Sequence, residues 1–338
     1  MPDTDPSTIH DLRTPALVVE SAVFDANLAA MDELLPGDRL RPHVKAFKST
    51  AIAARLADDG HRGFCCATPR EVEGLVAAGL GHDVLLANES LDVARLGALA
   101  DDARITVAID SDATLDAAVA GGIRSVLIDV EVGLPRCGCD PDDAARLAER
   151  ARSHGLDVRG VMGYEGHLMM VTDTDRQHEL VASSMALLQR AASEVGGDVV
   201  SGGGTGTCLT NTWCTEIQAG SYTLMDTDYA RQALPFEIAL NVLASVVSVS
   251  PKGWIVADAG LKSMAMDHGD PTWTEGEVMF LSDEHVTLRP HDPSSWAVGD
   301  TIRLLPAHVD PTVAKHRQMW LTDGEQVLDR WPVDLRHW

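Results

Sequence analysis

Short apolar segments alternate with longer amphipathic segments from residue 40 to about residue 230. Strands that are apolar on both faces and alternate with helices are typical of a parallel sheet covered by helices. Eight such segments occur, and eight β–α units favour a closed (β/α)8 barrel, an α/β fold, over an open sheet. The main alternative, a doubly wound sheet, would carry G-x-G-x-x-G after its first strand, and this chain does not. The eight predicted strands are RPHV (41–44), GFCCAT (63–68), DVLLAN (83–88), ITVAID (105–110), SVLIDV (125–130), VRGVMGY (158–164), DVVSGG (198–203) and SYTLMD (221–226).

Beyond residue 238 the pattern of the sequence changes. Segments such as GEVMFLS and HVTLRP are short, β-rich and separated by turn residues, which indicates an antiparallel sheet or barrel. We therefore predict a barrel at residues 14–236, followed by an antiparallel β-domain at residues 237–338. We expect residues 1–13 to pack on the second domain, whereas TPALVVE (14–20) either begins the first domain or pairs with the second.

The charge of the chain excludes several classes of partner. It carries 51 acidic and 27 basic residues, a net charge of −24, and both nucleic acids and anionic membranes require a positive surface. No apolar run is long enough to span a membrane, and the first residues lack signal-peptide character. The six cysteines form no pair of C-x-x-C motifs. We therefore expect a cytoplasmic, reduced protein that acts on a small molecule.

The segment RPHVKAFKST (41–50) gathers four basic side chains in this acidic protein: Arg41, His43, Lys45 and Lys48. Chemistry in a (β/α)8 barrel takes place at the C-terminal ends of the strands, and Lys45 directly follows the first one. A lysine that points into a barrel mouth can form a Schiff base with an aldehyde if desolvation or neighbouring cations lower its pKa. The alternative is a solvated basic patch, the commoner role of lysine.

A glycine-rich loop, SGGGTGT (201–207), follows the seventh predicted strand. Glycines allow backbone N–H groups to converge on an anion, and threonine hydroxyls add donors. Barrels commonly bind phosphate with the loops after strands 7 and 8, and AGSY (219–222) lies in the region of the eighth. The alternative is a plain glycine-rich turn. A lysine and a phosphate loop on one barrel face are the pairing that pyridoxal phosphate requires.

Two residues after other strands also face the predicted mouth. Arg136 follows the fifth strand and can pair with the phenolic oxygen of such a cofactor, and its alternative role is a surface salt bridge. Tyr164 follows the sixth strand and can stack on the cofactor or hydrogen-bond to it, and its alternative role is a rim aromatic. The neighbouring Glu165 and His167 receive no role from the sequence.

The tripeptide HVD (308–310) in the second half predicts a metal site. On a strand, residues i and i+2 point to the same face, so His308 and Asp310 can share a divalent ion and leave positions open for water and substrate. The alternative is a polar turn before Pro311.

The motifs RPHVKAFKS, DVEVGLPRCG, GYEGH, SGGGTGT, QAGSYTLMDTDY (218–229), DAGLK and PAHVDPT span nearly the whole chain in this order. Together they resemble the fold-type III pyridoxal phosphate enzymes with an alanine-racemase-like barrel, and most closely the D-threonine aldolase and D-serine dehydratase family. The resemblance implies a homodimer, a Schiff base on Lys45 and a metal ion on His308 and Asp310. The cofactor contacts that it implies are Lys45, Arg136, Tyr164, Thr205, Gly206, Thr207, Gly220, Ser221 and Tyr222.

The residue at position 310 separates the two subfamilies. The dehydratases typically carry H-x-C, which favours zinc, and the aldolases carry H-x-D, which suits manganese or magnesium better. Asp310 therefore predicts a metal-dependent aldolase that cleaves D-β-hydroxy-α-amino acids of the D-threonine type to glycine and an aldehyde, with manganese as the ion and magnesium or zinc as alternatives. A dehydratase of D-serine or 3-hydroxyaspartate, a racemase and a non-catalytic cofactor carrier are the other possibilities. One departure from the family is Phe47, where a histidine is usual.

Overall fold

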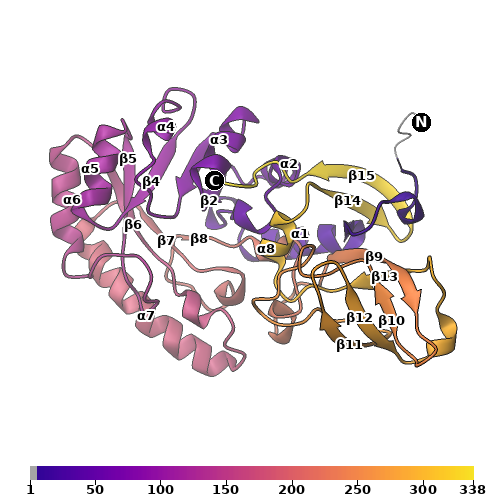
Figure 1. Cartoon of the computed structure of the whole chain (residues 1–338). Coiled ribbons are helices and arrows are strands. Elements are labelled where there is room, and N and C mark those ends of the chain that lie inside the picture. The colour runs from indigo at the N-terminus through magenta and orange to yellow at the C-terminus, as the bar shows by residue number, and fades with distance from the viewer. Residues whose placement is uncertain (1–5) are drawn as a thin grey trace. The chain divides into compact units, whose positions relative to one another are not determined.

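The structure is a computed structural model that describes residues 6–338, and it divides into two compact units (Figure 1). The first, here called the barrel unit, comprises residues 31–220 and 335–338. The second, the sheet unit, comprises residues 221–334 and the N-terminal segment up to residue 30. Helix α1 (Ser21–Leu34) spans the division. The domain limits expected from the sequence, 14–236 and 237–338, stay a prediction.

The barrel unit contains a parallel sheet in which β2 to β8 pair in chain order. The segment before β2 closes this sheet, because Leu40 bridges in parallel to Ile217 of β8 and His43 bridges in parallel to Cys65 of β2. The predicted eight-stranded barrel is therefore confirmed, with its first strand reduced to two bridges. The strands are β2 (Gly63–Cys66), β3 (Asp83–Leu86), β4 (Ile105–Ile109), β5 (Ser125–Asp129), β6 (Asp157–Gly163), β7 (Val199–Gly202) and β8 (Glu216–Ile217).

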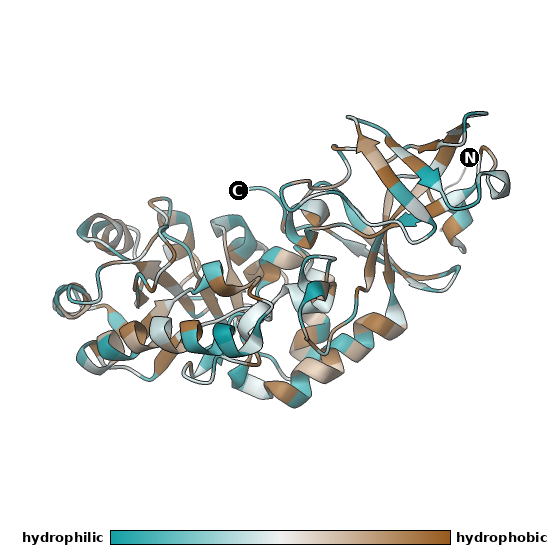
Figure 2. Cartoon of the chain, turned by 90° about the horizontal axis from the view of Figure 1, so that it is seen from below, coloured by the Kyte–Doolittle hydropathy of each residue, from teal (hydrophilic) through white to brown (hydrophobic). Residues whose placement is uncertain are grey.

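The helices of the barrel unit follow the predicted pattern and carry alternating hydrophobic and hydrophilic stretches (Figure 2). Gly79 and Gly155 lie just beyond α3 and α6 with φ values of +79° and +82°, the left-handed conformation that ends helices and favours glycine. Within residues 6–338, no helix combines the length and the apolar character needed to cross a membrane. The helices are α2 (Thr50–Asp58), α3 (Pro69–Ala77), α4 (Ala94–Gly97), α5 (Asp112–Ala120), α6 (Ala144–Ser153) and α7 (Thr174–Val195).

The prediction of the eighth strand at residues 221–226 is wrong. Its first residues form a single 3-10 turn, η6 (Ser221–Thr223), the N–H of Met225 donates to the carbonyl of Ser221 (2.7 Å), and Met225 adopts a φ of +55°. The eighth strand is Glu216–Ile217 instead. The error has a simple origin, because Tyr222, Leu224 and Met225 are fully buried, and a short buried turn shows the same apolar run as a buried strand.

The sheet unit is built on a mostly antiparallel sheet in the order β11-β12-β10-β9-β1-β14-β15, with β13 also paired to β9. Strand β1 (Ala16–Glu20) pairs antiparallel with β9 and parallel with β14. The segment TPALVVE therefore pairs with the second half of the chain, and the sheet is mixed at this one ladder. The other strands are β9 (Leu240–Val249), β10 (Ile255–Ala257), β11 (Gly276–Leu281), β12 (Val286–Pro290), β13 (Thr301–Leu304), β14 (Gln318–Asp323) and β15 (Gln326–Pro332), and the helix is α8 (Val309–Ala314).

Part of the N-terminal segment hydrogen-bonds to the second half of the chain. The N–H of Ile9 donates to the carbonyl of Glu325 (2.8 Å), and the carbonyl of Ser7 accepts from Val327 (3.0 Å). Residues 1–5 lie outside the described residues, and the packing expected for residues 1–13 stays a prediction.

The interior of the barrel is apolar in its middle and charged at its N-terminal end. An apolar cluster fills the middle: Cys65, Leu85, Ala108, Leu127 and Met162. Near the strand starts, Arg41 Nε donates to Glu216 Oε1 (2.7 Å) and Arg159 Nη1 donates to Asp83 Oδ1 (2.7 Å). These ion pairs lie at the end of the barrel opposite to Lys45, and the loss of one partner would leave a buried charge unpaired.

Candidate active site

Lys45 lies in η3 (Val44–Ala46), directly after the segment that closes the barrel. Its position is fixed on the side of β8, because the N–H of His43 donates to the carbonyl of Ala219 (2.9 Å). A Cβ atom at Gly220 would lie 2.1 Å from the carbonyl oxygen of His43. Only glycine therefore permits this close approach beside the segment that carries Lys45.

Tyr164 is the residue around which the predicted barrel-unit groups gather. The Nζ atom of Lys45 lies 5.7 Å from the centroid of the Tyr164 ring, and the Cζ atom of Arg136 lies 5.4 Å from the same centroid. A Cβ atom at Gly204, in the glycine-rich loop, would lie 3.6 Å from Cε2 of this ring. The structure thus brings together groups that follow the first, fifth, sixth and seventh strands.

Two of the four basic residues in RPHVKAFKST serve structural ion pairs. Arg41 is paired with Glu216 at the N-terminal end of the barrel, and Lys48 is paired with the buried Glu71. Their charges are compensated by these carboxylates.

His43, the third basic residue of the segment, is buried beside Lys45. Burial, followed by the charges of Lys45 and Lys48, holds the pKa of the His43 imidazole well below its usual range. Its Nδ1 accepts a hydrogen bond from the backbone N–H of Lys45 (3.4 Å). His43 is therefore a neutral acceptor that helps to orient the lysine segment.

The glycine-rich loop is a tight and fully buried turn. Gly203 adopts a φ of +71° before η5 (Thr205–Thr207). The N–H of Thr207 donates to the carbonyl of Gly204 (3.2 Å), and the N–H of Gly204 donates to Oγ1 of Thr207 (3.3 Å). A Cβ atom at Gly206 would lie 2.1 Å from the carbonyl oxygen of Met169, so the path of the loop depends on glycine at this position.

Sequence reasoning left Glu165 without a role, and the structure places it at this loop. Its carboxylate accepts hydrogen bonds from the backbone of Gly203 and from the side chains of Thr207 and Asn211. The only signal in the sequence is its position directly after Tyr164 in GYEGH. His167, also left open, contacts the position where a Cβ of Gly133 would lie.

In the sheet unit, HVD does not lie on a strand, which corrects the expectation. His308 is extended (φ −142°, ψ 114°) and precedes α8, whose first turn contains Asp310. The physical reason is Pro311, which is well tolerated in the first turn of a helix. The Nδ1 of His308 lies 2.6 Å from Oδ2 of Asp267, whereas Oδ1 of Asp310 accepts a hydrogen bond from the hydroxyl of Ser221 (3.0 Å).

His308 forms a cluster with two residues that the sequence did not single out, Asp267 and His268. The ligand atoms of these three residues lie within 4.8 Å of one another. The imidazoles of His268 and His308 stack with centroids 3.9 Å apart, and Nδ1 of His268 lies 2.9 Å from Oδ2 of Asp228. Partial burial raises the pKa of Asp267, but the hydrogen bond and charge of His308 outweigh this and bring it below its usual range.

A further buried carboxylate supports the start of α8. Asp226 accepts hydrogen bonds from the N–H groups of Val309 and Tyr229, both at 2.9 Å. Burial, with a smaller contribution from the charge of Asp310, raises the pKa of Asp226 to about 6 against the lowering effect of these hydrogen bonds. The last predicted contact, Tyr222, is fully buried with its ring 5.5 Å from that of Phe236.

The donor sets fit the two groups that the sequence predicts. An amine, a guanidinium, an aromatic ring and a glycine-rich loop are the groups that hold a phosphorylated aromatic aldehyde. Imidazole and carboxylate groups around His308 suit a borderline divalent ion such as manganese or zinc. The assignment of individual residues to these groups stays a prediction.

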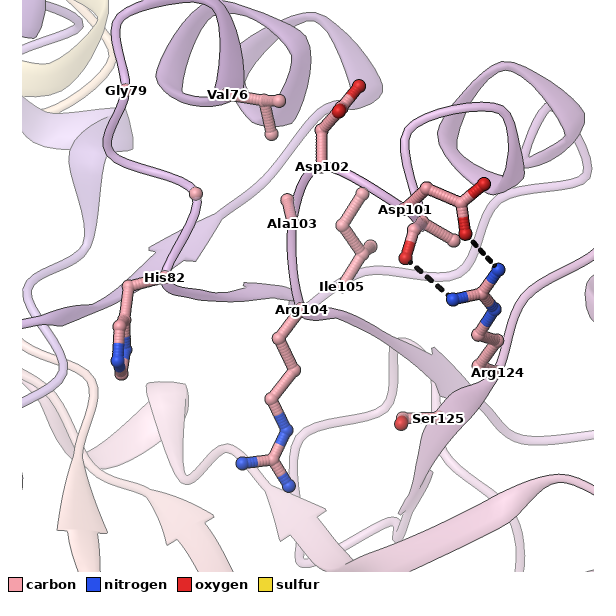
Figure 3. Close-up of a pocket in the computed structure, with 12 residues that line it drawn as sticks. Val76, Gly79, His82, Asp101, Asp102, Ala103, Arg104, Ile105, Arg124 and Ser125 are labelled. Atoms are coloured by element: carbon pink, nitrogen blue, oxygen red, sulfur yellow. Dashed lines mark hydrogen bonds and ion pairs between the residues drawn. The ribbon is translucent and has the colours of Figure 1, made fainter.

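A cavity of the barrel unit lies away from these residues (Figure 3). It has a volume of about 580 Å³ and is lined by residues around the N-terminal ends of β3, β4 and β5. Arg124 is bound there to the carbonyl of Ala100 (2.9 Å) and to Oδ1 of Asp101 (2.5 Å). Because Lys45 lies at the C-terminal end of the barrel, this cavity is not the site of the predicted chemistry.

Comparison with known proteins agrees with this geometry. Residues 19–228 match the family model "Alanine racemase, N-terminal domain", and residues 239–322 match "Putative serine dehydratase domain". The chain is 36% identical to a D-threonine aldolase of Arthrobacter sp., over 96% of this chain and 92% of the relative. It is 29% identical to a 3-hydroxy-D-aspartate aldolase of Paracoccus denitrificans, with the same coverage. The crystal structure of a D-threonine aldolase from Filomicrobium marinum superposes with a TM-score of 0.92, at 32% identity and 99% coverage of both chains.

The closed barrel, the lysine at its mouth and the separate sheet unit define an alanine-racemase-like pyridoxal phosphate enzyme of the lyase class. More narrowly, the chain belongs to the D-threonine aldolase and D-serine dehydratase family.

Proposed function

We propose that this protein is a pyridoxal phosphate- and divalent-metal-dependent aldolase that cleaves D-β-hydroxy-α-amino acids of the D-threonine type to glycine and an aldehyde. The observation that carries the proposal is the convergence of Lys45, Arg136 and the glycine-rich loop on Tyr164. The similarity to a D-threonine aldolase over nearly the whole chain supports the choice of reaction. The 3-hydroxy-D-aspartate aldolase relative supports an acidic substrate of the same class as an alternative.

In this proposal, Lys45 is the amine that holds the aldehyde of the cofactor, and Tyr164 packs against its ring. Arg136 supplies a positive charge for the phenolic oxygen. When bound, the cofactor withdraws the electrons that Cα–Cβ cleavage leaves on the α-carbon. Residues Thr205, Gly206, Thr207, Gly220, Ser221 and Tyr222 are proposed to bind its phosphate or complete its pocket.

His308 and Asp310 are proposed to hold the divalent ion. A divalent ion at this position favours ionisation of the β-hydroxyl group of the substrate, the step that starts cleavage. Asp267 holds Nδ1 of His308 at 2.6 Å, which leaves Nε2 as the ring nitrogen for the ion. The buried Phe47 cannot carry a proton, so the proton of the hydroxyl must leave through another group or through water.

A dehydratase that releases ammonia is the second candidate, because residues 239–322 match the serine dehydratase domain. The carboxylate at position 310 favours the aldolase, since a hard oxygen ligand suits manganese or magnesium better than a thiolate does. The same reasoning supports manganese as the ion.

We further propose a cytoplasmic homodimer. All six cysteines are described and free, which agrees with a reducing compartment. Among the described residues of β11, Phe280 and Met279 are exposed by 56% and 39%, which agrees with a surface that a second copy covers.

The test is release of glycine from D-threonine by the purified protein, with manganese and with a chelator. Glycine that forms with manganese and not with chelator supports the aldolase. If the protein forms pyruvate and ammonia from D-serine and no glycine from D-threonine, the aldolase proposal is wrong and the dehydratase takes its place.

A further inference from the structure

Glu165 is a buried carboxylate with no part in the proposed chemistry. It directly follows Tyr164 after β6, and its side chain is completely buried. Its Oε2 accepts from the N–H of Gly203 (3.1 Å). Its Oε1 accepts from the hydroxyl of Thr207 (2.9 Å) and from the side-chain amide of Asn211 (2.8 Å).

None of these three donors carries a charge. Burial of a carboxylate without a cation is costly unless hydrogen bonds satisfy its oxygens. Two of the three donors, on Gly203 and Thr207, belong to the glycine-rich loop. Loss of either would leave a buried charge short of a partner, so the loop and Glu165 hold each other in place.

The hydrogen bonds continue from Glu165 into the middle of the loop. The hydroxyl of Thr207, which donates to Glu165, also accepts from the N–H of Gly204 (3.3 Å). The side-chain amide of Gln177 donates to the carbonyl of Gly206 (3.0 Å). Both ends of the loop and one of its carbonyls are thereby fixed, and this determines the direction of the remaining backbone N–H groups.

We propose that Glu165 is the positioning residue of the phosphate loop and that it sets the preference of the protein for a phosphorylated over an unphosphorylated pyridoxal. The inference rests on the cofactor of the proposed function. A carboxylate near a phosphate also repels it, so the proposal requires that loop geometry outweighs this repulsion. The three donors favour this outcome because they already neutralise much of the carboxylate field.

The experiment compares the dissociation constants of pyridoxal phosphate and pyridoxal for the wild-type apoprotein and Glu165→Gln, measured by fluorescence titration. Glutamine has the same shape, but its amide nitrogen would face one of the three donors. We expect pyridoxal phosphate to bind about tenfold to a hundredfold more weakly, the effect of losing a hydrogen bond to a buried charge. The binding of pyridoxal should change by less than about threefold, because the proposed role of the loop is to bind the phosphate.

Glu216→Gln is the matched control, since Glu216 is also a buried barrel carboxylate but binds Arg41 and Ser201 at the opposite end. If the variants only lose stability, both should bind pyridoxal phosphate and pyridoxal more weakly. If Glu165 positions the loop, only Glu165→Gln should lose the preference for pyridoxal phosphate over pyridoxal. In Glu165→Gln combined with Asn211→Asp, the new amide donates to the new carboxylate, and we expect affinity to recover. If Glu165→Gln does not fold, Asn211→Ala removes a hydrogen bond to Glu165 from outside the glycine-rich loop and should lower the same preference.

Unchanged or tighter binding of pyridoxal phosphate by Glu165→Gln overturns the inference, as does an equal loss of both ligands. Asn211→Ala with an unchanged preference overturns it as well. If the wild type binds pyridoxal phosphate and Glu165→Gln binds it equally well, the inference on Glu165 is wrong but the proposed function is not affected. A wild-type protein that binds neither ligand overturns both.

Discussion

The two candidate sites of this chain are built in different ways. In the barrel unit, the glycine-rich loop is buried, with Thr205 and Thr207 exposed by 2% and 0%, and backbone groups and a buried carboxylate determine its shape. In the sheet unit, the cluster consists of side chains that remain accessible, with Asp267 and His308 exposed by 53% and 23%. The first site is therefore fixed by buried contacts, whereas the second is held by a hydrogen bond and ring stacking between accessible side chains.

This difference predicts how each site responds to change. Substitutions at a preformed backbone site change the local structure, so they affect the protein even when no ligand is bound. Substitutions at an exposed side-chain cluster act mainly on the ligand itself, because surface groups contribute little to folding.

The largest effect is expected for Lys45→Ala. Removal of the amine that holds the cofactor should lower turnover by at least about a thousandfold, since covalent attachment cannot be replaced. Turnover of D-threonine and the absorption spectrum of the purified variant measure this. Normal turnover by Lys45→Ala would contradict the assignment of the site.

The next effect is expected for Asp310→Ala, at about a hundredfold or more in turnover, because an ion ligand is lost. Cofactor content should remain at the wild-type level, and this distinguishes the effect of Asp310→Ala from that of Lys45→Ala. Full activity of the variant in the presence of chelator would show that the ion has no part in the reaction.

A smaller effect is expected for Asp267→Asn, because this carboxylate orients His308 through Nδ1. Loss of such an orienting partner weakens metal binding by about tenfold to a hundredfold. The affinity for Mn²⁺ can be measured by electron paramagnetic resonance of the free ion, with the exposed Asp283→Asn as the control. An affinity loss as large as that of Asp310→Ala would instead identify Asp267 as a direct ligand.

The smallest effect concerns His43 and the pH dependence of stability. Its pKa lies well below the ordinary value of 6.5 in the folded state, so below pH 6.5 the unfolded state binds the proton and the folded state does not. Its contribution to stability is therefore lost as the pH falls, by up to about 1.4 kcal/mol per pH unit.

Urea unfolding of the apoprotein at pH 7 and pH 5.5 measures the effect of His43. His43→Gln should lose less stability than the wild type between these pH values, whereas the exposed His10→Gln should behave like the wild type. Equal losses in the wild type and His43→Gln would rule out a buried neutral imidazole.

Much of this arrangement is readable from the sequence, because strands that are apolar on both faces fix a parallel barrel. The sequence points to Lys45 and the glycine-rich loop because a barrel has one functional end, and their roles stay predictions. Residues 221–226 were misassigned because a buried turn and a buried strand share one apolar pattern. The sequence does not indicate Asp267, His268 or Glu165. Their contacts join segments that are far apart in the sequence, and the spacing of residues along the chain does not show such contacts.

The seam of the barrel has a consequence for biosynthesis. Lys45 leaves the ribosome early, but the groups that pair with its segment, at Ile217 and Ala219, are among the last of the barrel to be translated. A nascent chain that ends before them has the lysine without the partner strand that positions it, and long-range pairing of this kind cannot form early. We therefore expect cofactor uptake to begin only after the last barrel strand has emerged from the ribosome. A newly made chain that holds cofactor should then have a closed barrel.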